Sequence, residues 1–333
     1  MTGEVAVALD VGGTGMKCAL VDTDGVVRHA ERHPTDTGRG PDAVVETILT
    51  VAEGLAGKAR ADGLTPIALG IVVPGVVDEA RGVAVWSANV GFRDVPLRDL
   101  ASARLGLPTA LGHDVRAGGL AEARLGAGRA TGHVLFVAIG TGIAAAHVVA
   151  GSAATGAHGA AGELGHILIR PDGPVCGCGR SGCLEALASA SAVARRYAEL
   201  TTAVTDAEPA AGVTTAPDGG SAAGPGPGRT MVTAAQVAAR AAAGEEVATR
   251  VWREAVEALA DGLATAQALF DVATIVLGGG LAQAGAGLFD PLRAALRDRL
   301  TFHREPQLVP AVLGDEAGCL GAALLALDQL ETP

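Results

Sequence analysis

Four residues that commonly bind metal ions cluster near the middle of the chain: His166, Cys176, Cys178 and Cys183. Three thiolates and one imidazole form the ligand set of a closed tetrahedral zinc site, and the glycines between them let the backbone fold around an ion. Two acids, Glu163 and Glu185, bracket the cluster. A zinc site with four other ligands does not need these carboxylates, so they are available for a second task.

Three glycine-rich turns could bind phosphate groups. They contain Gly12, Gly13 and Thr14 after Asp10; Gly140, Thr141 and Gly142; and Gly278, Gly279 and Gly280. Glycine lets backbone N–H groups approach phosphate oxygens, and the carboxylate of Asp10 could hold Mg²⁺ through water. The first turn lacks both the P-loop pattern and the GxGxxG pattern. Each turn alone is typical of a plain hairpin, whereas the three together favour a nucleotide site.

The elements that must position these groups alternate between strands and helices. Hairpins are predicted around the first two turns, a buried strand ends at Pro74-Gly75, and the strand 273–280 leads into the third turn. Helices are predicted at 42–62, 233–243, 245–269 and 317–331. The two similar hairpins suggest two related halves. Residues 203–230 are rich in Gly, Pro, Ala and Ser, which predicts a flexible surface insertion.

The composition is that of a folded protein with acidic surfaces. The 333 residues suggest about two domains, and 49% hydrophobic residues with only 2% aromatics predict cores of Ala, Val and Leu. A net charge of -11 argues against binding to nucleic acid or to anionic membranes. The N-terminal residues do not read as a secretory signal, no segment reads as a membrane span, and five cysteines fit reduced cytoplasmic thiols better than a disulfide framework.

Eight motifs in order, DVGGT, VPGVVD, SANVGF, GHD, IGTG, AGELGH, CGCGRSGCLE and LGGG, give the chain its strongest signature. Over nearly its whole length the chain resembles the ROK family of repressors, open reading frames and kinases, and in particular its sugar kinases. The resemblance implies an α/β, two-domain ribonuclease-H-like (actin-like ATPase) fold with an interdomain active-site cleft. The implied domains are 1–112, joined by the helix 317–331, and 113–316.

The resemblance also implies a role for each matching residue. Sugar contacts fall on Gly75, Asn89, His113, Glu163, His166 and Glu185, and the catalytic base falls on Asp114. The nucleotide would lie against the three glycine turns and Lys17, with ATP and Mg²⁺ as cofactors. The cysteines and His166 would hold a structural Zn²⁺ that orients the sugar-binding acids. A homodimer or higher homo-oligomer is implied as well. Without the resemblance, a lone Asp114 ahead of a helix is typical of an N-cap.

One departure from the family pattern bears on the substrate. Family kinases usually have Asn-Asp-Ala-Asn where this chain has His113-Asp114-Val115-Arg116, which keeps the base but leaves recognition of one hydroxyl open. The leading hypothesis is a glucokinase that phosphorylates the 6-hydroxyl. The alternatives are a kinase for another hexose or N-acetylhexosamine, a polyphosphate-dependent kinase, a non-catalytic sugar-binding protein and a sugar-responsive regulator. Regulators carry an N-terminal helix-turn-helix, whereas the first phosphate-loop strand is expected by about residue 4.

Overall fold

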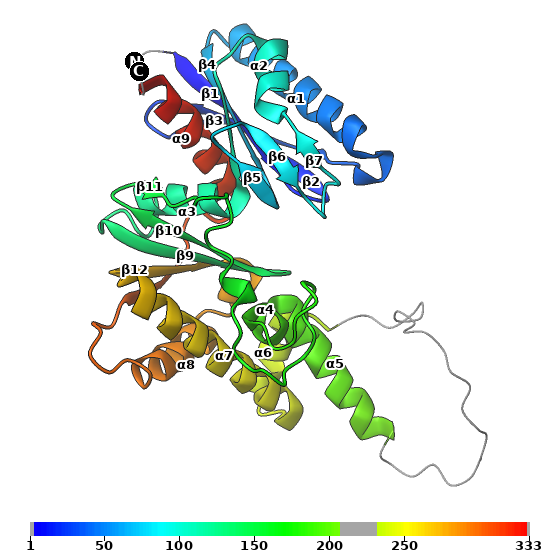
Figure 1. Cartoon of the computed structure of the whole chain (residues 1–333), viewed down its shortest axis with the longest axis vertical. Helices are drawn as coiled ribbons and strands as arrows, with labels where there is room; N and C mark the ends of the chain where they lie inside the picture. The colour runs from blue at the N-terminus through cyan, green and yellow to red at the C-terminus, as the bar shows by residue number, and fades with distance from the viewer. Residues whose placement is uncertain (1–2, 207–231, 332–333) are drawn as a thin grey trace, which may run out of the picture.

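The computed structural model describes residues 3–206 and 232–331. Its first sheet has the order β3-β2-β1-β4-β8, in which β1, β2 and β3 are antiparallel and β4 and β8 run parallel to β1. The strands are β1 Glu4–Val11, β2 Gly15–Asp22, β3 Val27–Pro34, β4 Thr65–Val73 and β8 Thr109–His113. Helices α1 (Pro41–Ala61) and α2 (Leu97–Leu105) cover one face (Figure 1). A small sheet of β5 (Val76–Asp78), β6 (Val83–Trp86) and β7 (Arg93–Val95) lies beside it.

The second sheet repeats this pattern, with the order β11-β10-β9-β12-β13. Its first three strands are antiparallel and the last two run parallel to β9. The strands are β9 His133–Ile139, β10 Ile143–Val149, β11 Ser152–Ala153, β12 Thr274–Gly278 and β13 Gln307–Pro310. The repeat confirms the predicted related halves and the ribonuclease-H-like, actin-like fold.

Helices pack below the second sheet, and the predicted helices are confirmed (Figure 1). They are α4 Leu184–Ala188, α5 Ala190–Asp206, α6 Ala234–Ala242, α7 Glu246–Phe270 and α8 Ala286–Arg297, with short 3-10 helices η2 Leu164–His166 and η3 Gly280–Ala284. The third glycine turn therefore opens a 3-10 helix before the α-helix begins. Helix α5 continues through residues 203–206, so the predicted start of the insertion at residue 203 is wrong. The rest of the predicted insertion, 207–230, lies outside the described residues.

Two helices lie between the sheets and connect the two halves. Helix α3 (Asp114–Arg124) contacts β8, β9 and β10, whereas α9 (Ala317–Glu331) packs on β1 and β4 of the first sheet. A Cβ added to Gly70 would lie 1.9 Å from the carbonyl oxygen of Ala322, so glycine is needed for this close approach. The division near residue 112 falls within β8, and we keep it as a proposal.

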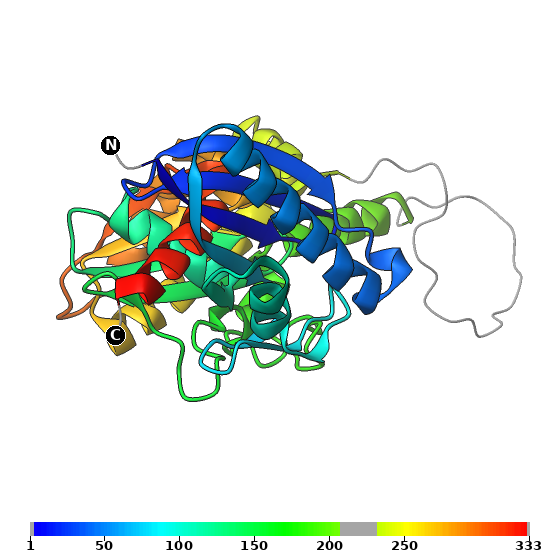
Figure 2. The same ribbon diagram turned by 90° about the horizontal axis from the view of Figure 1, so that it is seen from above.

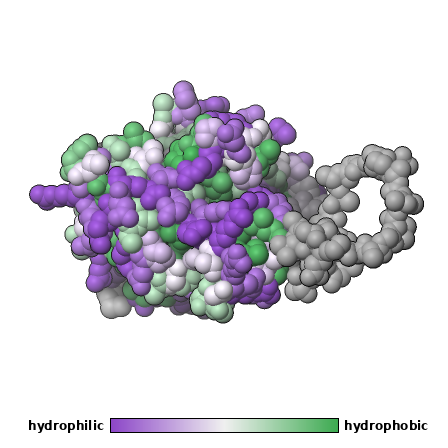
Figure 3. Space-filling view, turned by 90° about the horizontal axis from the view of Figure 1, so that it is seen from below, coloured by the Kyte–Doolittle hydropathy of each residue, from purple (hydrophilic) through white to green (hydrophobic). Residues whose placement is uncertain are grey.

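Small aliphatic side chains build the cores, as the composition predicts. The layer between the first sheet, α3 and α9 consists mainly of Ala, with Val72 and Leu320 among its larger members. Seen from above, the first sheet and α1 cover the second half of the molecule (Figure 2). Polar side chains dominate the underside, where apolar ones form small groups (Figure 3). Within the described residues, no helix is long and apolar enough to span a membrane.

Candidate functional site

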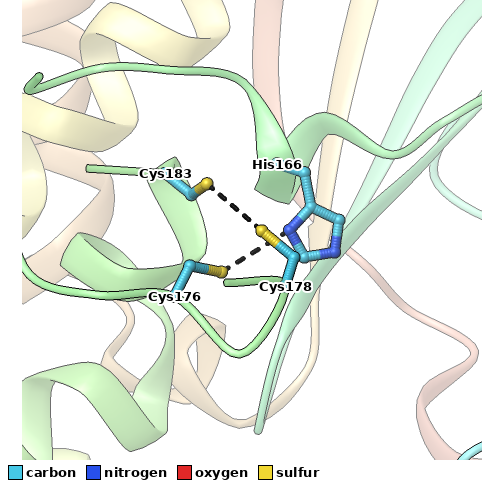
Figure 4. Close-up of side chains that lie close together, drawn as sticks. All are labelled: His166, Cys176, Cys178 and Cys183. Atoms are coloured by element: carbon cyan, nitrogen blue, oxygen red, sulfur yellow. Dashed lines mark hydrogen bonds between the residues drawn. The ribbon is translucent and has the colours of Figure 1, made fainter. Parts of the chain in front are cut away.

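The four predicted metal ligands converge on one point (Figure 4). Their ligand atoms all lie within 4.8 Å of one another. Cys176 Sγ is 3.6 Å from His166 Nδ1, and the Sγ atoms of Cys178 and Cys183 are 3.7 Å apart. Tetrahedral Zn²⁺ with Zn–S bonds of about 2.3 Å places its thiolates roughly 3.8 Å apart. The donor set and its spacing therefore fit zinc.

The two bracketing acids both contact this metal cluster. His166 ends η2, and its Nε2 lies 3.7 Å from Glu163 Oε2, on the side of the ring away from Cys176. Glu185 lies in the first turn of α4, where its Oε1 is 3.7 Å from Cys176 Sγ. Both carboxylates therefore lie against ligands of the cluster.

Glu185 also joins the metal loop to the second glycine turn. Its Oε2 accepts a hydrogen bond of 3.0 Å from the backbone N–H of Ile143, the first residue of β10. A Cβ on Gly142 would lie 2.4 Å from the same oxygen, which explains the glycine at this position. A predicted sugar-binding residue and a predicted phosphate loop are therefore in direct contact.

Asp114 is the first residue of α3, directly after β8. Its Oδ1 accepts a hydrogen bond of 2.7 Å from the Val115 N–H, and 31% of its side chain is exposed. The N-cap of α3 is His113, because its Nδ1 accepts from the Arg116 N–H. The alternative interpretation of Asp114 as an N-cap is therefore wrong, since another side chain fills that position.

His113 is buried among charged groups. Burial lowers the pKa of its imidazole; the charges of Asp114, Glu163 and Glu79 raise it, that of Arg116 lowers it further, and the net shift is downward. The ring is therefore neutral at neutral pH. Its Nε2 lies 3.4 Å from Asp114 Oδ1, so the imidazole contacts the predicted base.

Asp10, near the end of β1, is mostly buried beside the start of α9. Burial raises its pKa to about 6, the charge of Asp114 adds to the shift, and Lys17 opposes it. Lys17 Nζ lies 4.0 Å from Asp10 Oδ2 and 3.5 Å from Asp315 Oδ1. A buried carboxylate with a raised pKa is typical of a functional position rather than of a stabilising one.

We expect Asp10→Asn to unfold at a higher temperature than the wild type at pH 8. A folded-state pKa raised from 3.8 to about 6 means that stability falls as pH rises between these values, and the full cost remains above pH 6. Asparagine removes this cost, on the order of 1–3 kcal/mol. Thermal unfolding at pH 5 and pH 8 measures the effect, with the exposed Asp24→Asn as a control. An equal unfolding temperature for Asp10→Asn and wild type at pH 8 would contradict the expectation.

Two cavities lie next to the third glycine turn. One, of about 510 Å³, is lined by Gly278, Gly279 and Gly280 together with Lys17 and Asp315. The other, of about 610 Å³, is mostly apolar and lies between α6, α7 and α8 against Trp252. Both are lined by Gln283. The first and second glycine turns do not line either cavity, so the structure brings Lys17 to the third turn but does not unite all three.

The remaining predicted sugar contacts lie at the edge of the small sheet. Asn89 is exposed, and its Cβ would be 3.2 Å from a Cβ on Gly13, so it adjoins the first glycine turn. Gly75 has a φ of 106° and faces the Trp86 carbonyl, which leaves no room for a side chain.

Three charged residues of the site carry no assigned role in the sequence analysis. Arg116 is buried, with Nε 2.9 Å from Glu79 Oε1. Asp315 pairs with Lys17 and, at 2.8 Å, with Arg32. Arg116 was visible as a departure from the family pattern. No local sequence pattern indicates Glu79 or Asp315, because their partners lie 37 and 298 residues away.

A sequence model of the ROK family matches residues 6–329, so the chain belongs to the ROK family. The chain is 32% identical over 328 residues to a glucokinase of Streptomyces coelicolor, covering 97% of each protein. It is also 32% identical over 325 residues to an N-acetylmannosamine kinase of Citrobacter koseri, covering 96% of this chain and 97% of that one.

Solved structures support the same class of protein. A ROK hexokinase from Thermus thermophilus superposes with a TM-score of 0.81 at 32% identity, covering 99% of this chain and 100% of that chain. A ROK glucokinase from Streptomyces griseus, in complex with glucose and AMPPNP, has a TM-score of 0.74 at 28% identity and coverages of 97% and 99%. Fold, signature and relatives together define a ROK sugar kinase.

Proposed function

We propose that this ROK sugar kinase transfers the γ-phosphoryl group of ATP to the 6-hydroxyl of glucose, with Asp114 as the general base. The observation that carries the proposal is the partly exposed carboxylate of Asp114, which begins α3 directly after β8 and whose Oδ2 accepts no hydrogen bond among the described residues. The charge of Glu163, which contacts the metal cluster through His166, acts on the neighbouring His113. The glucose and AMPPNP bound by the Streptomyces griseus relative support the choice of both substrates.

The metal cluster orients the sugar-binding acids in this proposal. Zinc bound by the three cysteines and His166 would fix the loop from Glu163 to Glu185, because both carboxylates contact its ligands. Ionised carboxylates accept hydrogen bonds from sugar hydroxyls. Gly75 and Asn89 complete the proposed sugar-side set. Four protein ligands would leave no open position on the zinc, so its role would be structural.

The nucleotide is assigned to the two neighbouring cavities. The phosphates would lie in the cavity of Lys17 and Gly278–280, and Asp10 lies 4.0 Å from Lys17. The turns with Gly12, Gly13 and Thr14 and with Gly140, Thr141 and Gly142 do not line this cavity, and they are assigned to the nucleotide from the family pattern alone. The adenine would enter the apolar cavity beside Trp252, since both cavities meet at Gln283. Mg²⁺ would neutralise phosphate charge, and Asp10 would hold it through water.

The proposed reaction needs only ATP and glucose as reactants. Asp114 accepts the proton of the 6-hydroxyl as its oxygen forms a bond to the γ-phosphorus, and the bond from that phosphorus to the β,γ-bridging oxygen breaks. The products are ADP, glucose 6-phosphate and one proton, which Asp114 returns to solvent. Lys17 contributes positive charge next to the phosphates.

A panel of hexoses assayed for ADP production tests the substrate. We expect the highest kcat/KM with glucose, because Asn89, Glu163 and Glu185 are all present to bind its hydroxyls. ATP and polyphosphate are compared as donors in the same panel. A higher kcat/KM with N-acetylmannosamine, fructose or allose would refute the glucose assignment and leave the kinase assignment in place. The homo-oligomer implied by the family stays a prediction.

A further inference from the structure

His113 has both ring nitrogens directed at groups of its own chain. Nδ1 accepts a hydrogen bond of 3.4 Å from the Arg116 N–H, and Nε2 lies 3.4 Å from Asp114 Oδ1. Only 8% of the residue is exposed, so little of the ring is free to meet a ligand. These contacts differ from those of a side chain that projects into a sugar site.

The acceptor role of Nδ1 determines the protonation state of the ring. A nitrogen that accepts from a backbone N–H carries no proton, so the neutral imidazole must carry its proton on Nε2. That N–H faces Oδ1 of Asp114. Burial lowers the pKa of His113 and the Arg116 charge adds to the effect, against the charges of Asp114, Glu163 and Glu79. The net result favours this neutral form.

A buried ion pair between Arg116 and Glu79 supports this orientation of His113. Arg116 is 3% exposed; its Nε donates to Glu79 Oε1 at 2.9 Å and its NH1 to the Gly159 carbonyl at 2.9 Å. Glu79 Oε1 also accepts from the backbone N–H of His113 at 3.4 Å. Glu79 belongs to the turn after β5 and Gly159 to the segment before Glu163. The start of α3 is therefore pinned from both halves of the chain.

We propose that His113 is a positioning residue for Asp114: its Nε2–H holds Oδ1 and turns Oδ2 toward the substrate, and the Arg116–Glu79 pair locks the imidazole in that orientation. The proposal rests on the proposed function, because it assigns Asp114 as the base. Among the described residues, no hydrogen bond reaches Asp114 Oδ2. Oδ1 accepts a hydrogen bond from the Val115 N–H and lies 3.4 Å from the imidazole Nε2. The oxygen left without a partner is the one available to a hydroxyl proton.

The substitution His113→Asn separates this role from capping and from sugar recognition. Asparagine is a good N-cap and keeps an acceptor for the Arg116 N–H, but its shorter amide cannot also reach Oδ1. We expect kcat to fall about 10- to 100-fold, since misplacing a catalytic group by about 1 Å costs up to about 100-fold. The KM for the sugar should stay within about three-fold. The matched control is His33→Asn, which removes a half-exposed histidine paired with Glu31 on β3.

A double-mutant cycle tests the role of the ion pair. Arg116→Lys keeps the charge and loses the fork that binds Glu79 and Gly159 together. If both residues act through Asp114, the double variant loses no more kcat than the worse single variant. Losses in kcat that multiply would contradict the proposal, as would a His113→Asn variant in which only the KM for the sugar changes.

A readout without catalysis separates this inference from the proposed function. We expect nitrogen-15 NMR of histidine-labelled protein to show, among the signals of its eight histidines, a neutral Nε2–H ring at pH 7 whose signal is absent in His113→Asn. An Nδ1–H tautomer or a charged ring there would overturn the inference even if the enzyme is fully active. If the wild-type protein phosphorylates no sugar, the proposed function is wrong. The NMR signal would then test separately whether Nε2 of His113 carries the proton.

Discussion

Replacing Asp114 with asparagine should reduce kcat by on the order of 10²–10⁴-fold, the usual contribution of a general base. The amide has nearly the shape of the carboxylate, so its oxygen can still accept from the Val115 N–H. It cannot take the proton of the attacking hydroxyl. The KM for the sugar should therefore change little.

The matched control for Asp114→Asn is Asp42→Asn. Asp42 is an exposed acid in the first turn of α1, as Asp114 is an acid in the first turn of α3. Both variants remove one helix-terminal charge, and only one of them removes the proposed base. Steady-state kinetics with saturating ATP measures the effect. If Asp114→Asn keeps more than about a tenth of wild-type kcat, Asp114 is not the base.

Loss of the metal should lower both the stability and the sugar affinity of the protein. Cys178 is the exposed ligand, so Cys178→Ser removes a donor without opening a cavity in the core. Metal binding energy is folding energy, and a loss of on the order of 3 kcal/mol lowers Tm by roughly 4 °C in a protein of this size. The KM for the sugar should rise, because Glu163 and Glu185 are held by contacts with the ligands.

Elemental analysis together with unfolding tests this prediction. Wild type should contain one zinc per chain, Cys178→Ser almost none, and Cys18→Ala, which replaces a buried thiol of the first sheet, one again. A chelator should lower the Tm of wild type and of Cys18→Ala but not that of Cys178→Ser. Wild-type protein purified without chelator that contains no zinc would contradict a structural metal site.

The sequence was sufficient for the two hairpins, the four predicted helices and the metal cluster, because these depend on local signals. Hydrophobic alternation and glycine turns predict the two hairpins, and the ligand spacing predicts the cluster. Long-range pairing was beyond its reach: Glu79 and Arg116 are 37 positions apart, and Lys17 and Asp315 are 298. A polar residue on a turn carries no local sequence pattern that identifies such a distant partner.

His113 shows a second limit of the sequence. Its identity departs from the family pattern, and the natural inference is a changed contact with a sugar hydroxyl. The side chain instead caps α3 and faces Asp114, which depends on the backbone turn at the end of β8. The end of α5 is a further example. Residues 203–206 are helical, although the composition of 203–230 predicts a flexible insertion.

Phosphorus-31 NMR of the purified protein with glucose and MgATP follows the proposed transfer directly. We expect one new signal besides those of ADP, a sugar 6-phosphate, that grows in step with ADP and is absent with 6-deoxyglucose. The Asp114→Asn protein should produce the same signal far more slowly. ADP with free phosphate and no sugar phosphate, or no turnover of ATP with any hexose, would contradict the assignment of this chain as a hexose kinase.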